Sequence, residues 1–521
     1  MPSKGIVFSF LPVDRKFISF KAADITGSIM TRGFGHVFNN YSTSPFFDEM
    51  FTPEGKPKAH YETFHDVLKR FSEDELREKH ETAQLSFLRQ GITFTVYHNN
   101  VGTERTMPFD FVPIIIPPEE WEVVEKGMTQ RAEALNRFLE DVYDKQEIIE
   151  AGIVPRYLVE DNPYYYGKQM KGTKIPLSNH IFLAGIDLIR DEHGKYHVLE
   201  DNLRNPSGLS YVYQNRYVMR QVYPEFFVNH SVQTLERQMS FLHESILDHA
   251  PAKVKDKPLA VLLTPGMYNS AYYDHVFLAQ QMGMDLVEGR DLVVRNNIVY
   301  MKSIRGLKRV DIIYRRIDDD FLDPEAFRED SALGVRGLME AYHQGNVAIL
   351  NAVGNGVADD KAIYAYVPEM IRFYLGEEPI IDNVKTYLLD KPEEREWVLE
   401  RLDQLVVKNV GASGGYDMLI GPHASKELIE EFREKILEAP HQYIAQPTIK
   451  LSRAPAYQGE QFYPCHVDLR VFVMRGKKTH VLPGGLSRVA LKEGSLVVNS
   501  SQGGGGKDTW VFKKKDERED A

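Results

Sequence analysis

The stretch of sequence that decides the fold is residues 181–202, IFLAGIDLIRDEHGKYHVLEDN. Two runs rich in Ile, Leu and Val flank a polar four-residue turn that contains a glycine, and this arrangement is typical of a β-hairpin. We expect Arg190 to pair with Lys195 across the turn, which sets Asp187 opposite Val198. The sequence therefore predicts a hairpin whose second strand ends in acidic and amide side chains.

Three side chains of this hairpin carry oxygen atoms that suit a metal ion. Asp187 lies in the first strand, and Glu200 and Asn202 share one face of the second strand because strand side chains alternate. Two carboxylates and an amide oxygen are hard ligands, appropriate to a magnesium ion that also holds substrate phosphates. Asp187, Glu200 and Asn202 are therefore candidate metal ligands. The alternative for Asp187 is a surface residue that flanks the turn.

The composition is that of a soluble globular protein. The chain has 521 residues, of which 43% are hydrophobic and 26% are charged, and its formal net charge is -12. This length allows roughly three or four domains. An acidic balance disfavours a nucleic-acid surface, although a local basic pocket stays open. We expect small molecules or peptides as partners, and no nucleic acid.

Cysteine usage and the lack of long apolar runs indicate the compartment. The single cysteine, Cys465, excludes a disulfide framework within the chain and fits a reducing environment. The first residues lack a sustained apolar core and a small-residue cleavage site, so we expect no signal peptide. No run approaches about eighteen apolar residues, so we expect no membrane span. These features predict a cytoplasmic protein, and homo-oligomer formation stays open.

Composition and periodicity divide the chain into five parts. Helical periodicity follows residue 59, with a capping box at Ser72–Glu75. A linker rich in Pro and Lys at 251–258 precedes a segment that alternates strand and helix, as in a small doubly wound α/β domain. The parts are an N-terminal extension (1–89), the hairpin region (90–250), the α/β domain (258–350), a second α/β region (351–510) and a charged tail expected to be disordered (511–521).

A strand-like run ends in a lysine and continues into a Gly- and Ser-rich loop at residues 406–417. Backbone N–H groups of such a loop can cradle phosphates, and the lysine adds a point charge. The alternative is a tight turn with a surface lysine, because short glycine motifs occur by chance and the Walker pattern is absent. The candidate residues are Lys408, Gly411, Ser413, Gly414 and Gly415.

A helix is expected to open at Asp359-Asp360-Lys361 and to extend through Leu375. The two aspartates suit the positive end of a helix dipole, and that alone would explain them. A lysine in the first turn is electrostatically unfavourable unless an anion lies nearby. Lys361 is therefore a candidate ligand-binding residue.

Two further segments carry polar residues in a regular pattern. Alternation along the strand at 466–474 places His466, Asp468 and Arg470 on one face, which could be a solvated face held by ion pairs. Farther along come Arg488 and Asn499. Four consecutive glycines at 503–506 are costly to order, which favours a mobile lid or a loop that lets a ligand approach.

Together these segments resemble the ATP-grasp ligases, and their order resembles the circularly permuted ATP-grasp group that includes relatives of glutathionylspermidine synthetase. ATP-grasp enzymes present an Asp-Lys helix start, a strand lysine with a Gly-rich loop, an adenine-binding linker, an Asp-x-Arg strand and, last, a metal hairpin ending in Glu-x-Asn. This chain has Asp360-Lys361, Lys408, 443–447 and 468–470 in that order, whereas its metal hairpin lies upstream of them all. The resemblance covers residues 90–510.

The resemblance implies an α/β fold of mixed α+β character: a circularly permuted ATP-grasp fold with an inserted Rossmann-like domain and a helical N-terminal extension. It implies ATP and Mg²⁺ as cofactors. The metal ligands would be Asp187, Glu200 and Asn202, holding one or two ions, and Lys361 and Lys408 would contact the phosphates. The residues implied to bind the nucleotide are Lys361, Lys408, Gly411, Ser413, Gly414, Gly415, Gln446 (through nearby backbone, to adenine) and Asn499.

The implied reaction joins a small-molecule or peptide carboxylate to an amine and releases ADP and phosphate. A carboxylate is a poor electrophile, so ATP first converts it to an acyl phosphate. This step needs clustered cations and Mg²⁺ rather than a protein nucleophile. The segment 314–318 would lie beside the substrate. The residues implied to stabilise charge or bind the acceptor carboxylate are Arg204, Arg316, Arg470 and Arg488.

Two alternatives stay open at this point. One is an ATP-binding protein that is not a ligase, such as a kinase-like protein or an inactive scaffold or sensor; the presence of both lysines and all three metal-ligand types favours catalysis. The other, a thiol nucleophile, is disfavoured because Cys465 and His466 occupy adjacent strand positions that face opposite ways. No residue pattern specifies the acid or the amine.

Overall fold

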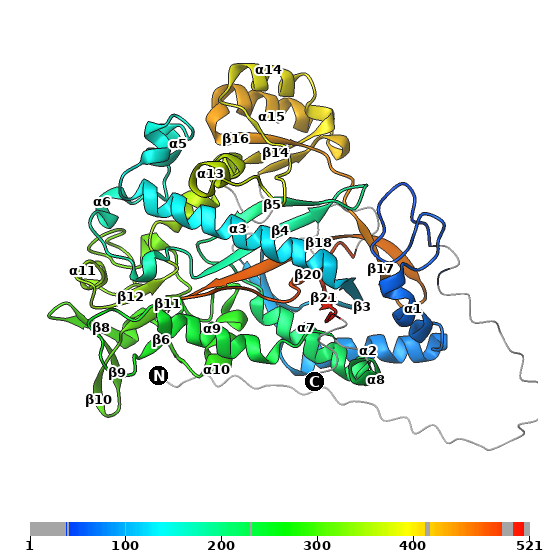
Figure 1. The fold of residues 1–521 in the computed structure, drawn as a ribbon, viewed down its shortest axis with the longest axis horizontal. Helices are drawn as coiled ribbons and strands as arrows, with labels where there is room; N and C mark the ends of the chain where they lie inside the picture. The colour runs from blue at the N-terminus through cyan, green and yellow to red at the C-terminus, as the bar shows by residue number, and fades with distance from the viewer. Residues whose placement is uncertain are drawn as a thin grey trace, which may run out of the picture.

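A computed structural model describes residue 38 and residues 41–98, 101–229, 232–411, 417–491 and 504–514. Over these ranges the strands form an eight-stranded sheet, two four-stranded sheets, a three-stranded sheet and a two-stranded ribbon. Figure 1 shows the large sheet at the centre, the parallel four-stranded sheet to one side and the antiparallel four-stranded sheet above. The predicted mixed α/β class is confirmed.

The eight-stranded sheet combines strands from both halves of the chain. Its order is β3-β21-β20-β18-β4-β5, with β17 and β19 also paired to β18. β18 lies antiparallel to β4, and β21 lies parallel to β3. The bounds are β3 Phe109–Ile116, β4 Leu183–Arg190, β5 Tyr196–Asn202, β17 Arg453–Tyr457, β18 Phe462–Arg475, β19 Thr479–Val481, β20 Leu486–Val489 and β21 Gly505–Val511.

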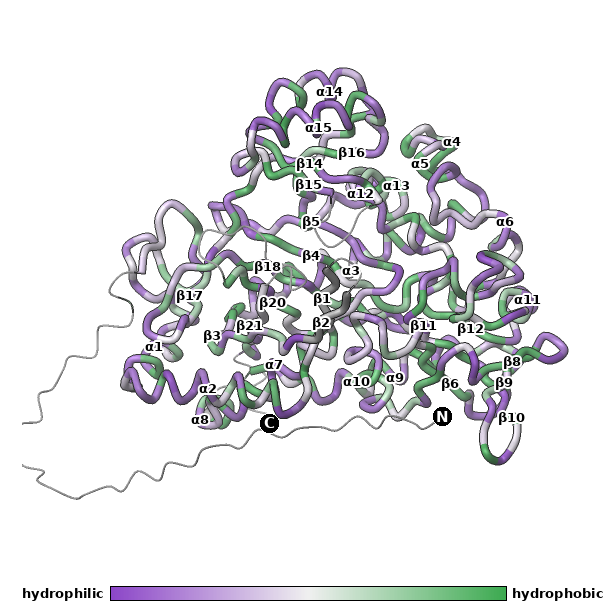
Figure 2. The backbone as a smooth tube through the Cα atoms, turned by 180° about the vertical axis from the view of Figure 1, so that it is seen from behind, coloured by the Kyte–Doolittle hydropathy of each residue, from purple (hydrophilic) through white to green (hydrophobic). Residues whose placement is uncertain are grey.

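Helices cover both faces of this sheet. On one face Ile186 and Val471 pack in a core with α3 (Pro118–Val142), and on the other Phe472 and Met474 pack in a core with α7 (Leu209–Val222) and α9 (Glu236–Asp248). Successive strand residues point to opposite faces, which explains the division. Figure 2 shows the hydrophobic residues concentrated along β4 and β18. On the α7 face the apolar pattern gives way to Asp187 and Arg470, where polar side chains gather.

The hairpin β4–β5 is confirmed, but its turn is longer than the sequence predicted. The Asp191 N–H donates to the Lys195 carbonyl (3.1 Å), and Asp191 Oδ1 accepts hydrogen bonds from the N–H groups of His193 and Lys195 (2.9 Å each). This Asx-type turn leaves Lys195 outside the ladder. Arg190 therefore pairs with Tyr196, and the expected pairing with Lys195 is wrong.

A β-bulge sets the register at the end of the hairpin that carries Glu200 and Asn202. Leu188 faces Val198 and Asp187 faces Glu200, so Leu199 is left as the extra residue between the two pairs. The expectation that Asp187 lies opposite Val198 is therefore wrong. The bulge brings the two carboxylates directly opposite each other.

A parallel sheet with the order β12-β11-β6-β7 occupies the predicted α/β region 258–350. α10 (Tyr272–Met282) connects β6 to β7, as predicted for a doubly wound unit. A three-stranded antiparallel sheet, β10-β9-β8, extends from this unit. The bounds are β6 Ala260–Leu263, β7 Asp285–Val287, β8 Leu292–Arg295, β9 Ile298–Ser303, β10 Gly306–Arg309, β11 Ile312–Arg315, α11 Leu338–His343 and β12 Ala348–Leu350.

The small antiparallel sheet has the order β13-β16-β14-β15. α14 (Pro392–Leu399) and α15 (Lys426–Glu438) cover one face and enclose an apolar core. In Figure 1 the opposite side of this sheet lies toward β5 and β4. The remaining bounds are α12 Lys361–Tyr364, α13 Val367–Leu375, β13 Tyr387–Leu388, β14 Leu405–Asn409, β15 Met418–Ile420 and β16 Tyr443–Pro447.

The N-terminal region is helical, as predicted, but its helix is divided at residues 69–72. Ser72 begins the second helix, and the predicted capping box between Ser72 and Glu75 is confirmed. No helix in the described ranges has the length and apolar character needed to cross a membrane. The bounds are α1 Glu62–Leu68, α2 Glu73–Arg89, β1 Thr93–His98, β2 Val101–Thr106, α4 Glu147–Glu150, α5 Arg156–Glu160, α6 Gly167–Met170 and α8 Pro224–Asn229.

The last described residues are more ordered than the sequence suggested. Gly505 and Gly506 lie buried in β21, so the expected mobile lid is wrong for these two residues. A Cβ atom on Gly506 would lie 3.0 Å from Met107 Cε, so glycine permits close packing here. Val511 also belongs to β21, and Phe512 bridges Val232. The predicted tail therefore does not begin at residue 511, and residues 515–521 lie outside the described ranges.

Candidate functional site

The candidate site lies on the α7 face of the large sheet, at the end nearer the small sheet. Asp187 on β4 pairs with Glu200 on β5, and Gly185 pairs with Asn202. Asp187 also pairs with Arg470 on β18. Directly opposed residues in a sheet project to the same face, so the strand register brings these polar side chains together.

A network of two arginines and two aspartates forms one half of the site. Arg470 donates two hydrogen bonds to Asp187, through Nε (2.6 Å) and Nη2 (2.8 Å). Arg488 on β20 donates through Nη2 to Asp187 (2.8 Å) and through Nε and Nη2 to Asp468 (2.9 and 2.6 Å). We call these four residues the arginine network. The network joins strands that are far apart in the sequence: Arg470 and Asp187 are separated by 283 positions.

The surroundings of Asp187 decide its role. Its side chain is 2% exposed, and burial alone would raise its pKa; the charges of Arg470 and Arg488 outweigh burial and lower the pKa to about 2. Both carboxylate oxygens already accept hydrogen bonds from guanidinium groups. A metal ion at Asp187 would share the carboxylate with two guanidinium groups. Asp187 thus lies in the predicted strand of the hairpin, and its described contacts are those of a residue that orients arginines.

The other half of the site has looser pairing. Glu200 has a 30% exposed side chain, and Lys361 Nζ lies 3.6 Å from its Oε1. Asn202 Nδ2 is buried and finds no hydrogen-bond partner among the described residues. No group of three or more His, Cys, Asp or Glu side chains in the described ranges is arranged to hold a metal ion. Glu200 and Asn202 remain a carboxylate and an amide whose polar atoms are not fully engaged.

Lys408 of β14 and Gln446 of β16 approach this half from the small sheet. Lys408 Nζ donates to Gln446 Oε1 (2.8 Å), and Gln446 Nε2 donates to Thr386 Oγ1 (3.0 Å). The pKa of Lys408 is lowered to about 8, mainly by burial; the charge of Glu200 opposes this shift, and the charge of Lys361 adds to it. The structure therefore brings Lys361, Lys408 and Glu200, predicted from separate segments, into one electrostatic neighbourhood. We call these three residues the lysine group.

Arg204 follows β5 and lies beside the lysine group. Its Nε is 3.6 Å from Asp318 and 3.7 Å from Asp359, and its guanidinium carbon lies 4.4 Å from the ring centre of Tyr164. Burial disfavours its charged form, but Asp318 and Asp359 raise the pKa of Arg204 above its usual value. The cation–π contact holds the guanidinium plane. Sequence reasoning found Arg204 and missed Tyr164, because no pattern links residues forty positions apart.

Arg316 does not join these groups. Its side chain is buried, donates through Nη1 to the carbonyl of Pro206 (2.7 Å) and lies 3.4 Å from Asp274 Oδ2. It thus tethers the segment after β5 to the parallel sheet. Arg315 is fully buried and donates to the carbonyls of Asn351, Ile317 and Ala352. Neither arginine contacts the arginine network or the lysine group through any described hydrogen bond.

The two aspartates before Lys361 have different roles. Asp360 is the N-cap of α12 and accepts hydrogen bonds from the N–H groups of Ala362 and Ile363, as its position predicted. Asp359 instead accepts a hydrogen bond from the Leu203 N–H (2.6 Å). Burial raises the pKa of Asp359 to about 7, and the charge of Glu200 contributes to this rise. The sequence did not distinguish the two residues, because both fit a helix start.

Several predicted residues cannot be placed. Ser413, Gly414, Gly415 and Asn499 lie outside the described ranges. Gly411 is described, and its N–H donates to Asn409 Oδ1 (3.0 Å) at the end of β14. The predicted phosphate loop and the contribution of Asn499 therefore stay predictions.

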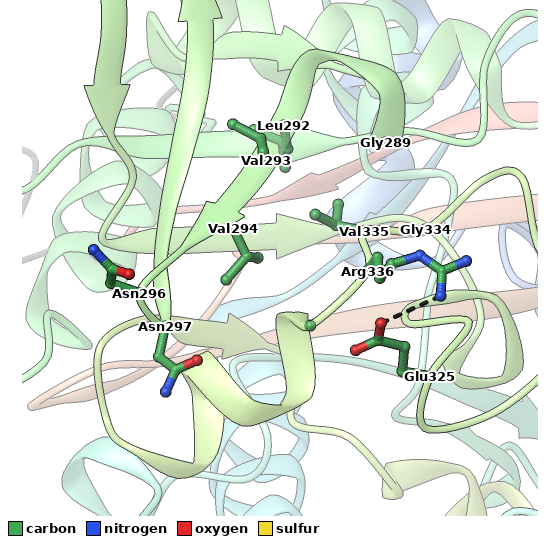
Figure 3. Close-up of a pocket in the computed structure, with 11 residues that line it drawn as sticks. Gly289, Leu292, Val293, Val294, Asn296, Asn297, Glu325, Gly334, Val335 and Arg336 are labelled. Carbon is green, nitrogen blue, oxygen red and sulfur yellow. Dashed lines mark hydrogen bonds and ion pairs between the residues drawn. The ribbon is translucent and has the colours of Figure 1, made fainter.

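The two other candidate features lie apart from this site. Cys465 is buried, and burial raises its pKa to about 11, which is unfavourable for a thiolate nucleophile. A surface pocket of about 460 Å³ lies beside β8 (Figure 3), with the exposed Glu325–Arg336 ion pair (3.2 Å) at its rim. This pocket shares no residue with the arginine network or the lysine group.

Comparison with protein families gives one match over most of the chain. A family model described as "Circularly permuted ATP-grasp type 2" matches residues 113–490. A Synechocystis protein described as uncharacterized is 51% identical over 474 residues, which cover 91% of this chain and 98% of that protein.

Two further similarities extend the comparison. A Frankia alni protein named "Putative glutamate--cysteine ligase 2-3" is 41% identical over 466 residues, which cover 89% of this chain but 54% of that protein. The solved structure of a glutathione synthetase-like effector from Globodera pallida has a TM-score of 0.54 at 12% identity and covers 85% of this chain and 98% of its own. The last similarity concerns the fold alone.

Proposed function

Because the chain belongs to the circularly permuted ATP-grasp family, we propose that it is an ATP-dependent carboxylate–amine ligase. In this proposal ATP phosphorylates a carboxylate to an acyl phosphate, an amine attacks it, and ADP and phosphate are released. The observation that carries the proposal is the convergence of Lys361 and Lys408 on Glu200, beside a preorganised pair of arginines. Phosphoryl transfer requires clustered cations and an oxygen ligand for a metal, and this arrangement supplies both.

The donor set fits a magnesium ion with nucleotide phosphates. Glu200 offers a partly exposed carboxylate, and Asn202, whose Oδ1 would be the ligand atom, lies two residues farther along the same face. Mg²⁺ prefers oxygen ligands and keeps several waters and phosphate oxygens in its shell, so one carboxylate and one amide are enough protein ligands. When bound, the ion would neutralise phosphate charge. We assign Glu200 and Asn202 to the metal.

The lysine group would hold the phosphates. Lys361 and Lys408 come from α12 and β14, so the two ammonium groups approach from different elements. Their mutual repulsion and the burial of Lys408 are both relieved when an anion binds between them, because the anion stabilises the charged form of each amine. Gly411 with Ser413, Gly414 and Gly415 would close over the phosphates, and the backbone near Gln446 would contact adenine.

The arginine network would stabilise charge on the transferring group. Arg470 is 13% exposed and held in one orientation by a two-point contact with Asp187, so its position costs little to reorganise during reaction. We therefore replace the predicted metal role of Asp187 by a positioning role toward Arg470 and Arg488. Arg204, fixed on Tyr164, would bind the acceptor carboxylate. Arg316 would support the segment that carries Arg204.

The relatives indicate the reaction class and leave the substrates open. The Frankia alni protein carries a name that describes the joining of a carboxylate to an amine. This chain covers about half of that protein, so we take from its name the reaction class alone. A small-molecule or peptide carboxylate and an amine are accordingly the proposed substrates, and Mg²⁺ and ATP the proposed cofactors.

Trapping the activated carboxylate tests the proposal. The protein would be incubated with ATP, Mg²⁺, hydroxylamine and single members of a panel of amino acids and peptides. We expect hydroxamate and ADP in equal amounts with at least one acid, because hydroxylamine attacks an acyl phosphate. A second panel, in which amino acids and polyamines replace hydroxylamine, identifies the amine. Tight ATP binding without ADP release across both panels would favour an inactive scaffold or sensor protein, and ADP release without hydroxamate or amide would favour a kinase-like protein.

A further inference from the structure

The segment that leads to Lys361 carries three polar side chains at intervals of four residues. It reads NAVGNGVADDK, residues 351–361, and the three are Asn351, Asn355 and Asp359. Asn351 and Asn355 are 1% and 0% exposed, so their amides are fully removed from water. Buried amides need hydrogen-bond partners, and the identity of those partners gives the segment its role.

All three side chains bind the peptide groups of one residue, Leu203. Its carbonyl accepts hydrogen bonds from Nδ2 of Asn351 (2.7 Å) and of Asn355 (3.3 Å). Its N–H donates to Oδ1 of Asp359 (2.6 Å). Leu203 directly follows Asn202, the last residue of β5. The segment therefore grips the chain at the point where the proposed metal-binding strand ends.

Asn351 also binds the beginning of the hairpin. Its Oδ1 accepts hydrogen bonds from the N–H groups of Phe182 (2.6 Å) and Leu183 (2.9 Å), and its Nδ2 donates to the Leu183 carbonyl (2.8 Å). Leu183 is the first residue of β4. One amide thus joins the start of β4 to the end of β5. An amide suits this position because it accepts at one atom and donates at the other, which neither Asp nor Leu can do.

We propose that Asn351, Asn355 and Asp359 are positioning residues that fix Glu200 and Asn202 relative to Lys361. The inference rests on the proposed function. We call the hydrogen bonds from these three side chains to Leu203 the clamp. Asp359 lies two residues before Lys361, and Leu203 lies one residue after Asn202. The clamp therefore connects Lys361 to β5 through a few covalent and hydrogen bonds. In unpermuted ATP-grasp enzymes the segment that starts with Asp-Lys comes first and the metal hairpin comes last. The clamp lets them act as one unit.

The decisive variant is Asn355→Leu, which keeps the size of the side chain and removes its N–H donors. Its matched control is Asn215→Leu on α7. Asn215 is also 0% exposed, donates to one backbone carbonyl (Lys507, 3.1 Å) and has an Oδ1 without a partner among the described residues, as Asn355 has. Each variant loses buried donors to backbone carbonyls, and only Asn355→Leu loosens Leu203. It removes the bond to the Leu203 carbonyl (3.3 Å) and a second bond to the His180 carbonyl (2.8 Å), while Asn351 and Asp359 keep their bonds to Leu203.

Two readouts besides turnover decide the outcome. Hydrogen exchange of the amides at 203–205 should be about tenfold faster in Asn355→Leu than in the wild type and unchanged in Asn215→Leu. Mn²⁺ binding in the presence of ADP, followed by electron paramagnetic resonance, should weaken about 10- to 100-fold in Asn355→Leu alone, the usual range for residues that orient metal ligands. If Asn355→Leu does not fold, Asn355→Ala removes the same donors with less bulk.

The outcomes separate this inference from the proposed function. If exchange at 203–205 and Mn²⁺ affinity are the same in Asn355→Leu and wild type, the clamp is overturned, even when the wild type forms ADP. If both change while no acid or amine elicits ADP from the wild type, the clamp stands and the ligase proposal fails. Hydrogen exchange decides the point even where no metal binds.

Discussion

The arginine network lies on the large sheet, and the lysine group joins Glu200 of that sheet to Lys361 of α12 and Lys408 of the small sheet. The charges of the two groups are paired differently. Asp187, with a 2% exposed side chain, holds Arg470 by two hydrogen bonds of 2.6 and 2.8 Å. Glu200 is 30% exposed and faces Lys361 at 3.6 Å, beyond hydrogen-bond distance. In the first region every charge is engaged by protein. In the second, Lys361 lies 3.6 Å from Glu200, and Lys408 donates to the amide oxygen of Gln446 rather than to a carboxylate.

This difference suggests separate roles: the arginine network holds the geometry of the site, and the lysine group is available to a ligand. A buried, multiply bonded ion pair fixes geometry but is costly to disturb, because removing one partner leaves an uncompensated charge. A loosely paired, partly exposed carboxylate such as Glu200 contributes little to stability. Substitutions in the arginine network should therefore reduce stability and activity together, whereas substitutions in the lysine group should reduce binding or activity alone.

The largest effect is expected for Asp187→Asn. It leaves Arg470 and Arg488 without their shared carboxylate, so the free energy of unfolding in urea should fall by about 3–5 kcal/mol. The wild-type contribution should also depend on acid. Because the folded-state pKa is lowered to about 2, the stabilisation is present above about pH 4 and is lost as the pH falls toward 2.

Asp201→Asn provides the matched control for this substitution. Asp201 is equally buried on the same hairpin and accepts two hydrogen bonds from Arg131 (2.7 and 2.6 Å), which lies on the α3 face. We expect a comparable loss of stability but a smaller loss of turnover per folded molecule. If Asp187→Asn unfolds at the wild-type urea concentration, the arginine network is not the rigid half of the site.

The next largest effect should be Glu200→Gln. The substitution keeps the shape of the side chain and removes the charge that we assign to the metal, so ADP formation should fall at least about a hundredfold, equivalent to about 2.7 kcal/mol. The melting temperature should stay within about 2 °C of the wild type, because an exposed and loosely paired carboxylate contributes little. Glu192→Gln, at the exposed turn of the same hairpin, is the control. Unchanged turnover in Glu200→Gln would contradict the assignment of Glu200 to the metal.

These two carboxylates also show how far the sequence could lead. The hairpin, the placement of Asp187 and Glu200 on one face and the family resemblance could all be read from alternation and motif order. The register could not, because it depends on the Asx-type turn at Asp191 and on the bulge at Leu199. Strand alternation and turn composition do not show that Lys195 and Leu199 will be left unpaired.

The arginine partners of Asp187 were unpredictable for a different physical reason. Its partners, Arg470 and Arg488, come from strands that pair only after the chain has folded over almost its full length. A motif records the residue type, and an aspartate serves equally as a metal ligand or an arginine partner. The same holds for Asp359 and Asp360, which are neighbours in sequence and differ in whether they bind their own helix or Leu203.

A smaller effect is expected for Lys408→Met. Methionine preserves the buried stem and removes the ammonium, so metal-free ATP affinity measured by calorimetry should fall about ten- to thirtyfold, or about 1.4–2 kcal/mol. Stability should hold or rise slightly, because a desolvated charge is removed. Lys426→Met on α15, beside the same small sheet, is the control and should bind ATP normally. Equal affinity in both variants would contradict the placement of Lys408 at the phosphates.

The smallest effect concerns pH and depends on the same amine. Burial lowers the pKa of Lys408 to about 8 in the free protein, so the binding form is nearly complete at pH 7 and scarce at pH 9. If only the protonated amine binds phosphate, ATP affinity should fall about tenfold over that interval, and binding near pH 9 should take up a proton. Calorimetry in two buffers with different ionisation enthalpies measures this uptake. Lys408→Met should abolish it, whereas an identical pH dependence in that variant would show that the titrating group lies elsewhere.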